Sequence, residues 1–225
     1  MTSFDPAQLQ RRDVARLINT IVAPRPIAWV SSISPEGIPN LAPFSFFNAF
    51  STAPPTVAIG PGSRSGVSKD SLRNIRASGE FVVSSVSEDL ALRANRTSAE
   101  FGPEVDEWTV ADVTAVPSET VTPPRVAESP ASLECRILQI VDLGAESTPT
   151  NSIIIARVTR IHVVDSALDG IVPQADALAL VGRAGGDLWV RTTDNFALRR
   201  PSSDDPAEVA IEGSLAGDEA YDVRH

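Results

Sequence analysis

The stretch Pro24–Pro55, PRPIAWVSSISPEGIPNLAPFSFFNAFSTAPP, decides the fold of this chain. It is too apolar for an ordinary loop, yet serines and asparagines alternate in it with tryptophan and phenylalanine. Buried polar groups cost free energy unless something pairs with them. The stretch therefore raises the question of which groups pair with its hydroxyls and amides.

The first half of this stretch predicts a strand. IAWVSSIS is rich in β-branched residues, and the turn residues of PEGIPN follow it. With LAPFSFFNAFS as the second strand, the pattern is typical of a hairpin. On the first strand, Trp29 and Ser31 face one side, and Val30 and Ser32 face the other.

The rest of the chain predicts many strands and few helices. TVAIG and EFVVSSV are short strands, and SLECRILQIVDLG and SIIIARVTRIHVVD are the longest strand candidates. Prolines are frequent between residues 101 and 130, which predicts little regular structure there. Together these patterns predict a mainly β fold, a closed or nearly closed antiparallel barrel.

Two helices are expected between the strands. KDSLRNIRAS predicts a short helix that Asp70 or Ser68 can cap and that ends at Gly79, which suits the left-handed C-terminal position. SEDLALRANRTSAEF predicts a second helix, with Ser87 as its cap.

Composition narrows the class of protein. The formal net charge is -10, which argues against a nucleic-acid partner. The single cysteine, Cys135, excludes an intramolecular disulfide and a cysteine-rich zinc site. The N-terminus has no apolar signal core and no run reaches membrane-span length, so we expect a soluble cytoplasmic protein with no membrane partner. We expect one domain over 1–201 and a disordered acidic tail over 202–225.

Residue chemistry on its own offers no catalytic or metal site. The only histidines are His162, which we interpret as structural, and the last residue, His225. Neither a nucleophile elbow nor a dinucleotide or P-loop glycine motif occurs. If the chain is an enzyme, we expect a bound cofactor to carry the reactive chemistry.

One loop has the composition of an anion site. GPGSRSGVSKDS brings glycines, and hence accessible backbone N–H groups, to the start of the predicted helix. Lys69, Ser71 and Arg64 add charge and a hydroxyl. An ordinary glycine loop followed by a helix cap explains the same residues, and both interpretations stay open.

The opening stretch supports the same idea from another side. Hydroxyls and amides beside aromatic walls suit a flat polar ring that carries a polyol chain. A barrel wall with hydroxyls bonded to backbone is the alternative. Phosphate, polyol and ring are the parts of one nucleotide-like cofactor, so the two features support each other.

At these residues the chain resembles the flavin reductase-like proteins with an FMN-binding split barrel. The matching motifs run in order from about Arg25 to Pro201: PRPIAWVSS, G.PNLAPFSFFNAFS..PP, SKDSLRNI, GEFVV, PPRVAESPASLEC, LVGRAGGDLWV and RRP. The resemblance implies a homodimer that binds FMN near the subunit interface, with NADH or NADPH as electron donor.

The resemblance also implies cofactor contacts. Carried over by motif, these are Trp29, Ser31, Ser32, Asn40, Ala42, Ser45, Phe46, Asn48, Arg64, Lys69, Asp70 and Ser71. The family often has threonine at Ser71, which keeps the hydroxyl, and asparagine at Ser84, which puts a contact from that position in doubt. The sequence has no clustered His and Cys spacing for a metal site, and the catalytic residues stay unknown.

The function expected from these features is an FMN-dependent oxidoreductase. In this interpretation, hydride passes from a nicotinamide to N5 of the flavin and then to an electron acceptor. A split-barrel protein that carries FMN without turnover, or none, is the first alternative. A related split-barrel oxidase with its own organic substrate is the second.

Overall fold

The computed structural model describes residues 1–62, 70–99, 101–102, 105–144 and 151–196. The chain divides into the units Met1–Thr192 and Thr193–His225, and every described helix and strand belongs to the first unit. Arg64, Lys69, the candidate cap Ser68 and the predicted tail lie outside the described residues.

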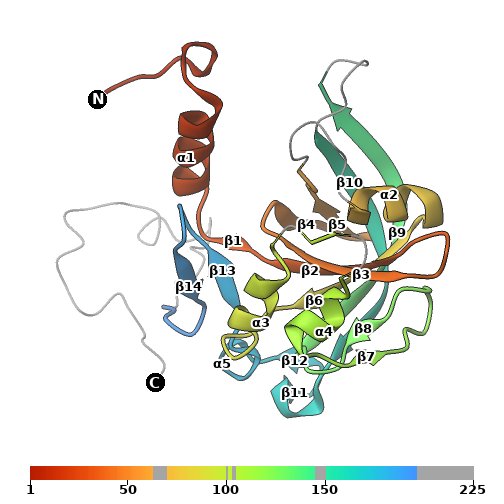
Figure 1. Ribbon diagram of the computed structural model, residues 1–225. Helices are drawn as coiled ribbons and strands as arrows, with labels where there is room; N and C mark the ends of the chain where they lie inside the picture. Colours follow the sequence, from red (N-terminus) through yellow and green to blue (C-terminus); the bar gives the residue numbers. More distant parts are fainter. Residues whose placement is uncertain (63–69, 100, 103–104, 145–150, 197–225) are drawn as a thin grey trace. The chain divides into compact units, whose positions relative to one another are not determined.

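Strands dominate the first unit, and the helices are short (Figure 1). The strands are β1 (Arg25–Pro26), β2 (Ala28–Ile33), β3 (Pro39–Phe44), β4 (Phe47–Thr52), β5 (Pro55–Ile59), β6 (Glu80–Ser85), β7 (Ala115–Val116), β8 (Arg125–Val126), β9 (Ala131–Leu143), β10 (Asn151–Val163), β11 (Leu168–Asp169), β12 (Val172–Pro173), β13 (Val181–Arg183) and β14 (Trp189–Arg191). The helices are η1 (Pro6–Gln8), α1 (Arg11–Ile21), α2 (Asp70–Ser78), α3 (Ala91–Arg96), α4 (Glu107–Ala111), η2 (Asp165–Ala167) and α5 (Ala175–Leu178). No helix in the described ranges is long and apolar enough to cross a membrane.

A seven-stranded antiparallel sheet forms the barrel wall, in the order β3-β2-β6-β9-β10-β5-β4. Its two edge strands, β3 and β4, follow one another in the chain and are separated only by Ser45 and Phe46. The sheet is therefore open between β3 and β4, and the two residues between these strands connect them across the opening. This confirms the prediction of a nearly closed antiparallel barrel.

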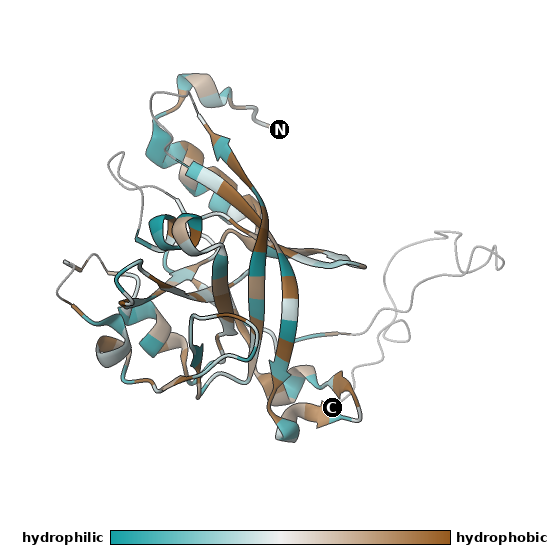
Figure 2. Ribbon diagram, turned by 90° about the vertical axis from the view of Figure 1, so that its right-hand side faces the viewer, coloured by the Kyte–Doolittle hydropathy of each residue, from teal (hydrophilic) through white to brown (hydrophobic). Residues whose placement is uncertain are grey.

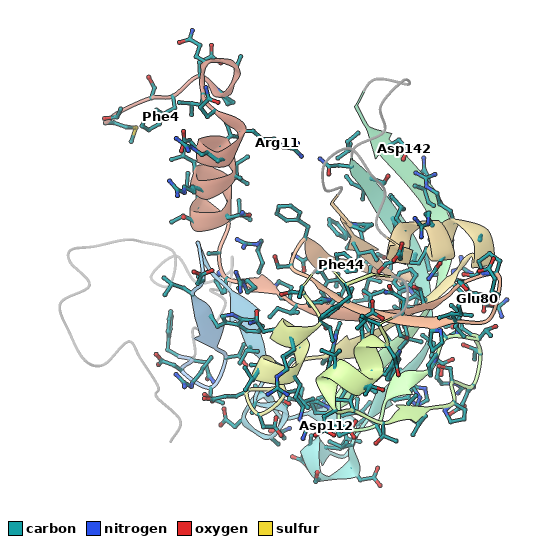
Figure 3. All side chains as sticks on the ribbon, viewed as in Figure 1. Phe4, Arg11, Phe44, Glu80, Asp112 and Asp142 are labelled. Carbon is teal, nitrogen blue, oxygen red and sulfur yellow. The ribbon has the colours of Figure 1, made fainter. Side chains whose placement is uncertain are left out.

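Two hydrophobic clusters pack on opposite faces of this sheet. One contains Val30 and Phe44 with residues of β5, β6, β9 and β10, and Phe44 lies near the middle of the strands (Figure 3). The other contains Trp29 and Leu41 with residues of α3 and α4. Neighbouring residues of β2 thus enter different clusters, as the alternation of a strand requires. Figure 2 shows the same alternation along the long strands.

Helix α2 packs on the first cluster and forms as the sequence predicts. Leu72 and Ile75 are buried in that cluster. Gly79 follows the helix with φ +74°, and its N–H donates to the carbonyl of Ile75 at 2.9 Å. This left-handed position is accessible to glycine at little cost, which explains the sharp end of the helix.

The prediction that the hairpin has a single second strand is wrong. LAPFSFFNAFS is not one strand: β3 ends at Phe44, and β4 begins at Phe47 and pairs with β5. Phe44 and Phe47 both pack in the first cluster, so the chain has to turn between them to keep both rings inside.

The predicted cap of the second helix is also wrong. Helix α3 begins at Ala91 rather than directly after Ser87, and Leu90 is its N-cap residue. The Ser87 hydroxyl donates to the Asp89 carboxylate at 2.5 Å. It stabilises the turn before the helix, because the chain must first bring Leu90 into the second cluster.

The prediction of little regular structure over residues 101–130 is wrong at α4 (Glu107–Ala111), which forms because Trp108 and Ala111 pack in the second cluster. Residues 114–130 contain little regular structure and lie against β6 and β9 (Figure 1). Side chains of the sheet hold this segment by its backbone. Ser84 accepts from the Val126 N–H at 3.2 Å, and Glu80 accepts from the Thr122 N–H at 2.9 Å. The segment thus replaces missing strand pairing with side-chain hydrogen bonds, which satisfies its backbone groups.

Candidate functional site

The start of α2 is fixed to the β2–β3 hairpin by two buried hydrogen bonds. Asn40 Nδ2 donates to Ser71 Oγ at 3.0 Å, and Asn74 Nδ2 donates to Ser32 Oγ at 3.3 Å. All four side chains are at most 9% exposed. These bonds position the first turn of the helix, and they answer in part the question of what pairs with the polar residues of the hairpin.

This junction leads to a stability prediction at Ser71. Ser71→Ala leaves the buried Asn40 amide without its acceptor, which we expect to lower the free energy of unfolding by about 1–3 kcal/mol. Urea unfolding followed by fluorescence measures it. Ser71→Thr keeps the hydroxyl and is the matched control; equal stability of the alanine and threonine variants would show that the bond contributes nothing.

Trp29 and Ser31 lie on the other face of β2, where Trp29 packs in the second cluster. The Trp29 indole N–H donates to Thr97 Oγ1 at 2.9 Å, and Ser31 Oγ donates to the Pro124 carbonyl at 2.5 Å. Both residues are fully buried, and both donate hydrogen bonds to other parts of the chain. The structure therefore does not bring them together with Ser32 and Asn40, although all four lie on one hairpin.

The remaining predicted residues of the stretch lie at the opening of the barrel. Ala42 packs against the first cluster and Ser45 is half-buried. Phe46 is 53% exposed, and Asn48 is exposed on β4 with its Oδ1 accepting from the N–H of Ala49 at 2.8 Å.

Phe46 is also joined to the glycine loop. The N–H of Gly60 donates to the Phe46 carbonyl at 2.7 Å. A Cβ at Gly60 would lie 3.0 Å from the Cβ of Phe46, so only glycine allows this close approach without a shift. The exposed ring and the first residue of the predicted anion loop are thereby held side by side.

Asp70 is the first described residue of α2. Its carboxylate pairs with Arg73, one turn further along the helix. An acidic side chain in the first turn stabilises a helix. The residue before the helix is Lys69, outside the described part, so the predicted role of Lys69 and Arg64 at this loop stays a prediction.

A cavity of about 510 Å³ adjoins this helix start. Asn40, Asp70 and Asn74 line it together with Glu107 and Trp108 of α4. Burial raises the pKa of Glu107, against hydrogen bonds from backbone N–H groups that lower it. The cavity is thus polar along α2 and has a carboxyl group that protonates more readily than an ordinary glutamate.

Sequence reasoning missed Asn74 and Glu107. Asn74 lies three residues after Ser71, on the buried face of α2, and that helical spacing could have identified it. Glu107 gives no such signal, because its approach to β3 depends on how the segment after α3 folds back. Within the described ranges, no group of at least three His, Cys, Asp or Glu side chains could hold a metal ion.

Comparison with known proteins finds similarity over most of this chain. The flavin reductase like domain family matches residues 22–181, which include the hairpin, α2 and the barrel strands. An uncharacterised protein of Halalkalibacterium halodurans, BH2278, is 36% identical over 88% of this chain and 96% of its own length.

Solved structures are similar over the same region. Nitrilotriacetate monooxygenase component B from Bacillus cereus is 31% identical, with a TM-score of 0.84 over 88% of this chain and 98% of its own. A protein from Shewanella frigidimarina described with a split barrel domain has a TM-score of 0.76 over 90% of this chain and 100% of its own. At 19% identity the latter shows the fold alone, and that fold is the predicted split barrel.

Proposed function

Because this chain belongs to the flavin reductase-like family, we propose that it binds FMN and acts as an oxidoreductase that takes hydride from NADH or NADPH. One structural observation carries the proposal. The bond between Gly60 and Phe46 joins an exposed aromatic ring to the loop that leads into α2. The proposed ring site at Phe46 therefore lies beside the first residue of the loop for which a phosphate is proposed, and this supports a flavin with a phosphate.

The residues present fit such a cofactor. Phe46 offers an apolar face for a flat ring, and Asn48 on the next strand offers an amide. Arg25 Nε is a buried donor without an acceptor in the described part of the chain, and the Arg25 guanidinium lies 6.0 Å from the centre of the Phe46 ring. A flat ring that carries carbonyl groups suits this combination of an apolar face and hydrogen-bond donors.

The chemistry in this proposal is divided between cofactor and chain. Bound FMN supplies the hydride-accepting atom N5. Phe46 and Asn48 orient the ring at the barrel opening, and the N-terminal turn of α2 holds the phosphate, since helix N–H groups there lack partners within the helix. Ser32, Asn40, Ser71 and Asn74 fix that turn on the hairpin and keep ring and phosphate sites in register.

Turnover by the purified protein tests the proposal. We expect flavin absorbance, and consumption of NADH or NADPH that increases with added FMN. Bound flavin without nicotinamide consumption would favour a carrier, and turnover that requires an organic substrate would favour a split-barrel oxidase. The Bacillus cereus protein is named as a component of a monooxygenase, so the assay is run with and without an external electron acceptor.

The phosphate assignment leads to a prediction at Lys69. If Lys69 binds the FMN phosphate, Lys69→Ala should weaken FMN binding about ten- to a hundredfold, because it removes a charge-assisted hydrogen bond. Riboflavin lacks the phosphate, so its affinity should hardly change. Titration of each flavin into the flavin-free protein measures both.

The matched control for Lys69 lies at the other end of the same helix. Arg76, in the last turn of α2, pairs with Asp142 of β9, and Arg76→Ala should leave both flavin affinities unchanged. Parallel losses for FMN and riboflavin in the Lys69 variant would remove the phosphate assignment.

We also propose that the protein is a homodimer. The phenylalanines after β2 divide into two groups: Phe44 and Phe47 pack in the barrel core, whereas Phe46 and Phe50 are 53% and 70% exposed. The exposed pair flanks the open edge of β4. A two-fold contact at this edge would cover both rings and place the ring site near a subunit interface.

A further inference from the structure

Figure 1 shows the small sheet β1-β13-β14. Its register places two arginines directly opposite one another, Arg25 on β1 and Arg183 on β13. Arg25 is only 7% exposed, and Arg183 is half-buried. Burial, and then the charge of Arg183, lowers the pKa of Arg25. Like charges directly opposite on antiparallel strands are destabilising, so this pair needs a reason.

Neither arginine has a carboxylate partner in the described part of the chain. Their hydrogen bonds go to backbone carbonyls, those of Asn19, Val22 and Ala184 for Arg25 and that of Gly186 for Arg183. Hydrogen bonds to carbonyls orient the guanidinium groups but do not neutralise them. Two positive charges therefore lie together without a counter-charge, in a chain of net charge -10.

Aromatic rings flank the two charges. The guanidinium carbon of Arg25 lies 6.0 Å from the centre of the Phe46 ring, and that of Arg183 lies 5.1 Å from the centre of the Trp189 ring. Phe46 is more than half exposed and Trp189 is half-buried. Flat apolar faces beside unneutralised cations are the surroundings that bind an anionic group attached to an aromatic ring.

A structural role explains part of this arrangement. Arg25 Nη1 lies 2.5 and 2.6 Å from the carbonyls of Asn19 and Val22, at the C-terminus of α1, where a positive charge stabilises a helix. That role leaves Arg183 unexplained, because Arg183 adds a second charge directly opposite the first.

We propose that Arg183, backed by the buried Arg25, binds the phosphate or carboxylate group of a small aromatic ligand. The subsite is distinct from the start of α2, where we place the FMN phosphate. The inference rests on the proposed function, in which a second ligand binds beside the flavin. The subsite recognises that ligand by one of two groups, the pyrophosphate of a nicotinamide dinucleotide or the carboxylate of an aromatic acid.

Binding of non-reacting probes tests the subsite. NAD⁺ and benzoate are titrated into the purified protein, and the fluorescence of Trp189 and the other tryptophans is followed. Arg183→Gln should weaken binding of the probe that carries the recognised anion about ten- to a hundredfold, as expected for a lost charge-assisted hydrogen bond. Arg183→Lys keeps the charge and should retain most of the affinity.

Arg191→Gln is the matched control. Arg191 lies on the neighbouring strand β14, but its charge is neutralised by Glu88 at 2.6 Å. The Arg191→Gln substitution should change the affinity for either probe less than about twofold. Thermal melting shows whether each variant is folded. Higher ionic strength should weaken binding to the wild type, since the interaction is between charges.

Probes that lack the anionic group distinguish the two sources of the anion. Nicotinamide riboside lacks the pyrophosphate and benzyl alcohol lacks the carboxylate. If NAD⁺ binding falls in Arg183→Gln and nicotinamide riboside binding does not, the ligand group is phosphate. The corresponding result with benzoate and benzyl alcohol identifies a carboxylate.

Failure of this inference differs from failure of the proposed function. If the wild type binds neither NAD⁺ nor benzoate, or if Arg183→Gln and Arg191→Gln behave alike, the subsite is overturned even when FMN binds normally. If the wild type binds no FMN, the proposed function fails, while the anion titrations on the same flavin-free protein still decide whether Arg183 binds an anion.

Discussion

Glu134→Ala is expected to lower the free energy of unfolding by about 3–5 kcal/mol, the range for removal of one partner from a buried charged network. Glu134 lies near the start of β9 and is fully buried. Its carboxylate accepts from the N–H groups of Glu119 and Thr120 at 2.8 and 2.6 Å and from the Thr120 hydroxyl at 2.6 Å. Without it, these donors lie unpaired against the sheet.

His162 completes the network. Its Nε2 lies 2.7 Å from Glu134 Oε1, and since an ionised carboxylate only accepts, this nitrogen is the donor. The histidine thus has the structural role that the sequence suggested. The carboxylate joins β9, β10 and the segment before β8, so its loss should also release that segment from the sheet.

The effect of Glu134 depends on pH in a defined direction. Burial raises the pKa of Glu134, but the hydrogen bonds from Thr120, Glu119 and His162 outweigh it and bring the pKa to about 2, below the ordinary value of 4.5. A carboxylate with a lowered folded-state pKa stabilises the fold above its unfolded pKa, and this contribution is lost as pH falls toward the folded value. The shift corresponds to roughly 3 kcal/mol, more than half of which is lost at about pH 3.

Urea unfolding of the wild type and Glu134→Gln at neutral and acidic pH measures this contribution. The stability difference between them should shrink between about pH 5 and pH 3. Glu119→Gln is the control: that side chain is 56% exposed, and we expect a change within about 0.5 kcal/mol. A difference between wild type and Glu134→Gln that is constant over this range would show that the carboxylate is not the stabilising group.

Strands could be predicted where apolar and polar residues alternate clearly along one segment of the chain. β2, β6, β9 and β10 alternate or run apolar over their length, and the helix over α2 ends at a glycine. These signals depend on neighbouring residues, which a sequence displays directly. The family motifs added the order of the strands, which alternation alone does not determine.

Features that depend on distant residues could not be predicted. Glu134 looks like an outward-facing residue of a strand, and its burial follows only from Glu119 and Thr120 folding over it. Helix α1 was missed for a different reason: Val14, Leu17, Ile18 and Ile21 recur at helical spacing, and this pattern was not used. The contact of Arg25 with the C-terminal carbonyls of α1 comes from a neighbouring strand and has no local pattern.

The candidate site, too, was predicted only in part. Ser32, Asn40 and Ser71 were predicted by motif, and the structure brings them to one junction with the unpredicted Asn74. Trp29 and Ser31 lie on the opposite face, as alternation along β2 requires. As flavin contacts all these residues stay predictions, because the sequence gives residue types and faces but not the position of a ligand.

The edge strand β4 leads to the second prediction, that Phe50→Asp weakens self-association. Most of β4 is exposed, with its only described partner strand on one side. An exposed apolar edge strand invites pairing with another chain, and soluble proteins normally protect such edges. Phe50 is 70% exposed, so this apolar side chain does not protect the edge of β4 from pairing. We therefore propose that a second copy of the chain covers Phe50.

The size of the effect follows from symmetry. In a two-fold interface each substitution occurs twice. Burying one phenylalanine side chain contributes about 1.5–3 kcal/mol, so losing two costs about 3–6 kcal/mol and weakens dimerisation roughly a hundred- to ten-thousandfold. Because Phe46 and Asn48 lie on the same edge, FMN affinity should fall together with dimerisation.

Sedimentation equilibrium over a range of concentrations measures the association, and FMN titration of the same samples measures the coupling. Phe4→Asp is the matched control, since Phe4 is similarly exposed, at 57%, but lies before α1 and away from β4. Thermal melting should show both variants folded, because neither ring packs in the core. A wild type that sediments as a monomer at all concentrations, or equal association of the Phe50 and Phe4 variants, would mean that the edge of β4 is not the dimer interface.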